Sequence, residues 1–207
     1  NFTTIQKAIN VAWPGDTIKV FPGRYDERIV INKSLTLMGA TKGISKKDYV
    51  IPAGYTYDET KESIILPTVN QNDEVVEITF GSVIFDGFIV ANTVAESYSS
   101  SLTHLIGLSN QSADYSDVTI QNNVLGPNTN DGTQNGNKGR AGIAVYGQSP
   151  SKMHNFTISQ NKIFNAEGDG CGILLLGALN SSTTAGTVGK YQNSKIDNNT
   201  ITGNHRS

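Results

Sequence analysis

A phrase of apolar and polar residues recurs four times from residue 84 onward. Each copy begins with an isoleucine, has Gly or Asn three positions later and an apolar residue five positions later. Successive copies start 36, 38 and 38 residues apart. A period of this length is typical of proteins built from stacked repeats. The copies are Ile84–Ile89, Ile120–Leu125, Ile158–Ile163 and Ile196–Ile201.

Each phrase predicts two short strands joined by a corner. Gly and Asn tolerate left-handed backbone dihedrals, so they favour the position where the chain turns. The corners are therefore predicted at Gly87, Asn123, Asn161 and Asn199. In this register the leading isoleucines are expected to lie above one another inside the coil. The three asparagines are expected to form a ladder of side-chain hydrogen bonds.

A further apolar run between successive phrases predicts a third strand in each coil. One coil leaves its apolar inside uncovered at top and bottom, so only a neighbouring coil can bury it. Residues beyond the three strands are expected to loop out, at 43–62, 127–140 and 180–192. The predicted third strands are Leu105–Leu108, Ile143–Tyr146 and Ile173–Leu176.

The first forty residues differ from the repeat. Thr3 or Thr4 can cap a short helix whose apolar residues recur at helical intervals. Such a helix is expected to cover the open end of the first coil. Strands are predicted at 17–21, 28–31 and 34–38, with a Pro22-Gly23 turn between the first two. The apolar face of the helix consists of Ile5, Ala8, Ile9 and Ala12.

Together these elements predict an all-β fold, a right-handed parallel β-helix that forms a three-sheet solenoid with an N-terminal capping helix. We expect one domain over 1–207, with the cap and first coil in 1–40 and the repeat coils in 41–207. The last phrase ends at Ile201 without a cap. A bare terminal coil exposes unpaired backbone groups. We therefore expect a longer protein with further coils, or another protein chain against this end.

Composition narrows the classes of partner. Charged residues make up only 16% of the chain and there are 21 glycines, which favours short strands with tight turns and excludes a helical bundle. The 16 basic and 18 acidic residues give a net charge of −2, without a basic run that could follow a phosphate backbone. Nucleic acid is therefore excluded as a partner. No apolar run approaches the roughly 18 residues that a membrane span needs.

Several N-terminal stretches carry a family resemblance. They resemble the cap and first coil of pectin-lyase-like β-helix proteins, especially the NosD-like surface and periplasmic proteins with parallel β-helix repeats. The resemblance implies the same right-handed fold and an extracellular or cell-surface location. It does not imply one activity, because this scaffold hosts lyases, hydrolases, esterases, adhesins and inert stalks. The stretches are Phe2–Ile9, Pro14–Ile18, Val20–Tyr25 and Ile31–Gly39.

The catalytic sets of such enzymes are not complete in this sequence. The aspartate pair and arginine that a pectin methylesterase resemblance implies have no counterpart. For the clustered carboxylates and the Gly-His-Gly segment that a polygalacturonase-type hydrolase needs, the candidate in this sequence is Glu167-Gly168-Asp169. His104 and the two other histidines are isolated. Cys171, between two glycines, is expected to be a small buried residue and not a nucleophile.

A lyase needs a base beside a carboxylate, often with Ca²⁺ to hold the substrate acid. Lys152 can supply the base, as can Lys162 or Arg140. Asp86 is expected to stack on Asn122, Gln160 and Asn198 in a polar ladder. A catalytic role would need a second carboxylate beside it. The catalytic candidates are therefore Asp169, Glu167, Lys152 and Asp86. No cofactor is expected, although Ca²⁺ can bind aspartates such as Asp114, Asp117, Asp131 and Asp169.

Two functions remain open. The favoured one is a non-catalytic extracellular module with a structural or carbohydrate-binding role, in which Tyr146, Tyr115 and Tyr191 stack on sugars of a polysaccharide or surface glycan. Half-buried strand tyrosines are the alternative for these three residues. The rival function is a fragment or divergent member of a lyase or hydrolase family acting on acidic polysaccharide. Six N-glycosylation sequons are compatible with a secreted glycoprotein.

Overall fold

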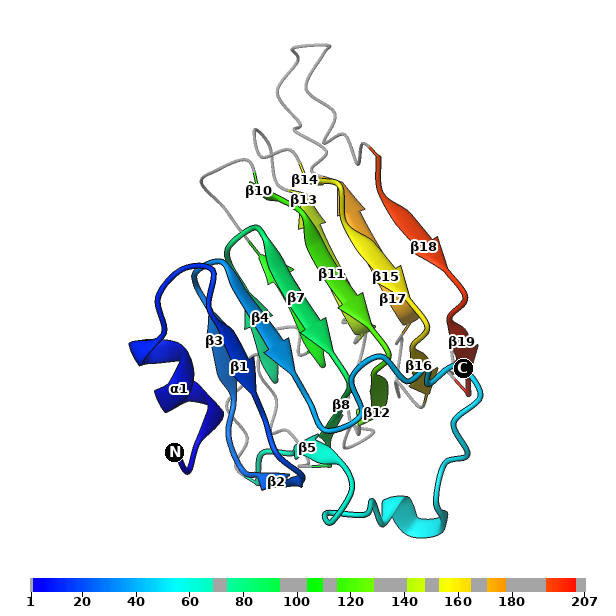
Figure 1. The fold of residues 1–207 in the computed structure, drawn as a ribbon. Helices are drawn as coiled ribbons and strands as arrows, with labels where there is room; N and C mark the ends of the chain where they lie inside the picture. The colour runs from blue at the N-terminus through cyan, green and yellow to red at the C-terminus, as the bar shows by residue number, and fades with distance from the viewer. Residues whose placement is uncertain are drawn as a thin grey trace.

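The computed structural model of the chain is a right-handed parallel β-helix (Figure 1). It describes residues 2–68, 74–93, 104–109, 115–128, 141–147, 153–164, 171–177 and 193–203. The chain passes through three sheets, A, B and C, in turn, and every pairing among the described strands is parallel. The predicted fold class is therefore confirmed.

Each sheet collects one strand from each successive coil. Sheet A contains β1 (Thr17–Lys19), β4 (Leu35–Met38), β7 (Val83–Asp86), β11 (Val118–Gln121), β15 (Thr157–Ser159) and β18 (Lys195–Asp197). Sheet B contains β2 (Gly23–Tyr25), β5 (Ser63–Ile65), β8 (Phe88–Asn92), β12 (Val124–Asn128), β16 (Lys162–Phe164) and β19 (Thr200–Thr202). Sheet C contains β3 (Ile29–Ile31), β6 (Val76–Ile78), β9 (Ile106–Ser109), β13 (Ala141–Gly147) and β17 (Cys171–Gly177). A short pair, β10 (Tyr115–Ser116) and β14 (Met153–His154), stands apart.

The hydrophobic core runs along the inside of the solenoid. In sheet A the paired residues Leu37, Phe85, Ile120 and Ile158 are all fully buried. The rings of Phe85 and Phe88 stack with their centroids 4.3 Å apart. Because parallel pairing places like positions one strand spacing apart, each buried side chain rests on the equivalent one of the next coil.

The predicted capping helix is present as α1 (Ile5–Val11) at the N-terminal end of the solenoid (Figure 1). Its N-cap is Thr4, whose hydroxyl accepts the Lys7 N–H at 3.3 Å. The Glu27 carboxylate accepts the N–H groups of Ile5 at 2.7 Å and of Gln6 at 2.9 Å. These bonds satisfy donors that a helix start leaves unpaired. The helix contacts β3, and its buried Ile5 belongs to the core of the solenoid, so α1 covers the first coil as expected.

The predicted register is wrong at the first phrase. Ile84 pairs with Thr119 and is 37% exposed, whereas Phe85 pairs with Ile120 and is buried. The register offset between these coils is 35 residues, not 36. In a strand, a shift of one residue moves a side chain to the opposite face of the sheet, so Ile84 points outward. Likewise Val90, and not Ile89, pairs with Leu125 and belongs to the inner core.

The later phrases have the predicted register. Ile120, Ile158 and Ile196 are paired in sheet A, and Leu125, Ile163 and Ile201 are paired in sheet B. Their offset is 38 residues.

The left-handed corner residues come one position before the predicted asparagines. Asn122, Gln160 and Asn198 have φ of +57°, +60° and +52°, and they follow β11, β15 and β18 directly. Gly87, with φ +84°, takes the corresponding place after β7. The predicted position was wrong by one residue in these three coils, because the asparagine that recurs in the sequence is the second residue of the corner.

The asparagines at this second position point into the solenoid and form a ladder. Asn123 Nδ2 donates to Asn161 Oδ1 at 3.1 Å, and Asn161 Nδ2 donates to Asn199 Oδ1 at 2.9 Å. The same Oδ1 atoms also accept the backbone N–H groups of Asn123 and Asn161, at 2.9 and 3.0 Å. Each amide therefore satisfies backbone groups that a corner removes from the sheet.

Residues 40–62, here called the strap, leave the coil after β4 and pack over the outer face of sheet B. The strap contains a short 3₁₀ helix, η1 (Ala53–Tyr55). Its Lys46 N–H donates to Gln160 O at 2.9 Å, three coils beyond β4. Its Tyr57 hydroxyl donates to Gly126 O at 2.5 Å. The strap thus covers the outer face of sheet B, and the apolar runs of this sheet are buried on both faces. Tyr49, Ile51 and Tyr57 of the strap pack against an outer cluster that consists of Ile64, Leu66, Ile89, Ala91, Val124 and Phe164.

At the other end, β17, β18 and β19 are the last strands of their sheets among the described residues. Ile196 and Ile201, which continue the buried rows, are 43% and 46% exposed there. No helix in the described part of the chain is long and apolar enough to cross a membrane.

Candidate functional site

The outer face of sheet C brings together three polar residues from three coils. Glu74 stands two residues before β6, His104 two residues before β9, and Tyr146 near the end of β13. Glu74 and His104 are buried, at 8% and 0% exposure, and Tyr146 is half-buried. The rings of His104 and Tyr146 lie with centroids 5.7 Å apart. His104 is therefore not isolated, contrary to the sequence prediction.

Small residues in the sheet make room for this group. Gly107 pairs with Ala144, and a Cβ atom added to Gly107 would lie 2.4 Å from Glu74 Cγ. Glycine inside a strand often marks a place where another group approaches the backbone closely. The sequence shows a glycine within this strand, but only the structure shows that it makes room for Glu74 of the preceding coil.

A chain of hydrogen bonds fixes the orientation of the histidine. The Ala141 N–H donates to His104 Nδ1 at 2.8 Å, so Nδ1 carries no proton and the ring proton belongs to Nε2. Nε2 is in hydrogen-bonding contact with the Tyr146 hydroxyl, to which it donates. The Tyr146 hydroxyl therefore accepts this bond and keeps its own hydrogen.

The surroundings of Tyr146 favour the protonated form of its phenol. Burial, followed by the negative charge of Glu74 and then by Cys171, raises the pKa of Tyr146 to about 12. Tyr146 is therefore a neutral donor at physiological pH and cannot act as a phenolate base. Burial also raises the pKa of the Cys171 thiol, which disfavours the thiolate. Cys171 is half-buried at the start of β17, and not fully buried as predicted.

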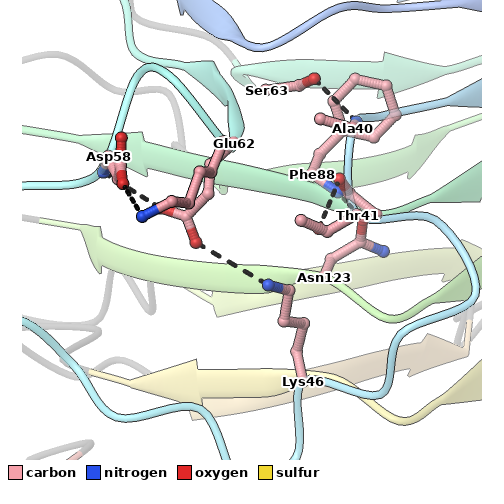
Figure 2. A network of polar contacts seen from close by, with 10 residues as sticks. Ala40, Thr41, Lys46, Asp58, Glu62, Ser63, Phe88 and Asn123 are labelled. Carbon is pink, nitrogen blue, oxygen red and sulfur yellow. Dashed lines mark hydrogen bonds and ion pairs between the residues drawn. The ribbon is translucent and has the colours of Figure 1, made fainter.

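A second polar group lies inside the strap. Figure 2 shows Lys46 and Glu62 extending toward each other from two parts of the strap. Their side chains are 8% and 9% exposed, and Lys46 Nζ lies 3.7 Å from Glu62 Oε1. The Lys46 ammonium also lies 4.8 Å from the centroid of the Tyr49 ring. Nearer the solvent, Lys61 Nζ lies 2.7 Å from Asp58 Oδ2.

Residues 1–207 match the family described as "Protein of unknown function (DUF1565)". The chain belongs to this family. No curated protein is significantly similar to it.

This DUF1565 chain is similar in fold to solved structures of pectin methylesterases. It is similar to the pectin methylesterase from Aspergillus niger in deglycosylated forms, with 15% identity and a TM-score of 0.50, over 95% of this chain and 64% of that one. The pectin methylesterase from Yersinia enterocolitica has 13% identity and a TM-score of 0.45, over 95% and 66%. The chain thus spans less than two thirds of the length of either enzyme. At this identity the likeness concerns the fold alone.

The structure gives Asp86 a supporting role. Its carboxylate accepts hydrogen bonds from Gln121 Nε2 at 2.9 Å, Asn122 Nδ2 at 2.8 Å and the Gly43 N–H at 3.0 Å. Asp86 pairs with Gln121 in the sheet, not with Asn122 as predicted. These three bonds anchor the start of the strap and the next corner. No second carboxylate joins Asp86 in a described hydrogen bond, as a catalytic pair would require.

The other catalytic and sugar-binding candidates lie mostly outside the described residues. This holds for Asp169, Glu167, Lys152 and Tyr191, and for the side chain of Tyr115. Of the aspartates predicted as Ca²⁺ ligands, Asp117 is described, and its Oδ1 and Oδ2 accept from Asn155 Nδ2 at 3.3 Å and Ser116 Oγ at 2.6 Å. Within the described ranges, no three His, Cys, Asp or Glu residues are grouped so that they could hold a metal ion.

Proposed function

We propose that this DUF1565 chain is an extracellular glycan-binding β-helix module that binds carbohydrate on the outer face of sheet C. One observation carries the proposal. The half-buried Tyr146 hydroxyl is oriented by the buried His104, beside the buried Glu74 carboxylate. Sugar hydroxyls need both donors and acceptors, and an oriented phenol beside a carboxylate offers both.

The same geometry supports binding more than catalysis. An acid or base at neutral pH needs a pKa near the working pH. The pKa of Tyr146 is raised to about 12, so the phenol holds its proton through the physiological range. The extracellular location is part of the proposal, and it is supported by the sequons at Asn32 and Asn198, whose side chains are exposed.

Replacing Tyr146 by phenylalanine is expected to weaken glycan binding while leaving the fold intact. The change removes the hydroxyl and keeps the ring, so it costs one hydrogen bond, about 1 kcal/mol or roughly a fivefold loss of affinity. Affinity is measured by titration calorimetry against soluble polysaccharides, both neutral and acidic. Tyr25→Phe is the matched control, because the Tyr25 hydroxyl donates to Phe21 O at 3.0 Å from strand β2 of sheet B. Equal losses in both variants would contradict the proposed site.

The isolated chain is expected to release neither unsaturated products nor reducing ends from pectate, alginate or neutral glycans. The expectation rests on the sequence, in which no complete set of acid, base and substrate-neutralising residues is found. Product formation is followed by ultraviolet absorbance and a reducing-sugar assay. Release that disappears in Asp169→Asn or Glu167→Gln would favour the rival function of a polysaccharide lyase or hydrolase.

A further inference from the structure

The strap carries an open surface cleft that belongs to neither the core nor the sheet C face. Its volume is about 450 Å³, and every residue that lines it lies within 41–62. Cavities of this size accommodate small ligands. Lys46 and Glu62 line the cleft together with Tyr49, Val50 and Pro52.

The two buried charges on the cleft wall do not close a direct hydrogen bond. Lys46 Nζ and Glu62 Oε1 are 3.7 Å apart, beyond the usual 2.7 to 3.2 Å of an N–H···O bond. Glu62 Oε2 accepts the Asp58 N–H at 3.2 Å, which holds the carboxylate in place. Burial lowers the pKa of Lys46, while the nearby Glu62 opposes that shift. A desolvated ammonium in this position gains from any additional acceptor.

The charges that line the cleft cancel in pairs, because Lys46 faces Glu62 and Lys61 faces Asp58. An ionic ligand would therefore meet one attractive and one repulsive charge in each pair. A ligand with two adjacent hydroxyl groups meets both wall charges at once. One hydroxyl oxygen accepts from the Lys46 ammonium, and the neighbouring hydroxyl donates to the Glu62 carboxylate.

We propose that the strap cleft binds one neutral sugar residue through a pair of adjacent ring hydroxyls held between Lys46 and Glu62 (Figure 2). The ring carbons of the sugar pack beside Val50 and Pro52, which also line the cleft. This site shares no residue with the sheet C face. Loss of binding in the strap cleft would therefore leave the proposed binding on sheet C untouched, and the reverse also holds.

The test is an NMR titration of the full chain with the methyl glycosides of glucose, galactose and mannose. At least one glycoside is expected to shift the strap amides, such as those of Thr41 and Asp58, in a saturable way. The double variant Lys46→Met/Glu62→Gln is expected to lose at least tenfold in affinity. It removes both charges together, so that no unpaired charge remains buried, and glutamine retains an acceptor for the Asp58 N–H.

The controls separate this site from a general effect on the strap. Lys47→Met makes the same change one residue away, where the side chain is 42% exposed, and is expected to bind as the parent chain does. Tetrahydropyran-2-methanol, a similar ring with a single hydroxyl, is expected not to bind. Tyr146→Phe is expected to leave the strap shifts unchanged.

The proposal is overturned by unshifted strap amides with all three glycosides, by unchanged affinity of the double variant, or by equal binding of the single-hydroxyl ring. If the double variant loses the spectrum of the folded coils, Lys46→Gln/Glu62→Gln carries the affinity comparison, because it also removes both charges and keeps polar groups at both positions.

Discussion

Replacing Gly39 by alanine is expected to destabilise the fold by about 3 kcal/mol or more. An added Cβ would lie 2.2 Å from Gly87 O and 2.7 Å from Gly87 C. Both are backbone atoms of the next coil, where Gly39 N–H donates to Asp86 O at 2.8 Å. Relief of the overlap therefore has to separate two coils. The free energy of unfolding is measured by denaturant titration.

Gly43→Ala is the matched control for this prediction. Gly43 lies four residues further on, and an added Cβ would meet no atom within 4 Å. Its φ of +72° carries the ordinary cost of a left-handed residue, about 1 kcal/mol. A loss at Gly39 no larger than the loss at Gly43 would show that the coils at this corner can move apart without much cost.

Replacing Asn161 by leucine is expected to lower the free energy of unfolding by about 3 to 5 kcal/mol. The leucine keeps the volume of the side chain but removes every polar atom. The backbone N–H and Nδ2 of Asn123 lose their acceptor, and Ile120 O loses the donor that lies 3.0 Å away. These groups are buried, so water cannot replace the lost partner and the full desolvation penalty remains.

The same leucine at Asn32 is the control, because that side chain is exposed and outside the ladder. A change within about 0.5 kcal/mol is expected there. Parallel denaturant titrations of both variants provide the comparison. Asn161→Leu unfolding at the same denaturant concentration as the parent chain would refute a stabilising role of the ladder.

The sequence by itself determined the architecture. The period of 36 to 38 residues, with three apolar runs in each period, was enough to predict three strands per coil and three parallel sheets. A helix start at Thr3 or Thr4 could be predicted because a threonine cap and apolar residues at helical spacing are both local signals, and the structure has the cap at Thr4. Such features depend on neighbours in the sequence, so no distant contact is needed to recognise them.

The tertiary structure decided the register at Ile84 and the corner positions. Ile84 and Phe85 are adjacent apolar residues, and either can begin a repeat phrase. Only pairing with β11 selects Phe85 for the inside of the coil. The loops between strands differ in length from coil to coil, so the true offset follows from hydrogen bonds between coils and not from counting residues.

The tertiary structure also decided where polar side chains meet. Glu74, His104 and Tyr146 lie far apart along the chain and share no motif, and parallel stacking alone brings them onto one face of sheet C. Lys46 and Glu62 look like ordinary loop charges in the sequence, yet the strap buries them because apolar side chains on the outer face of sheet B need a cover. The sequence pattern determines which residues face the core, because that requirement repeats in every coil. The polar contacts of the two candidate sites each occur once and follow no repeat, so they can be identified only in the folded chain.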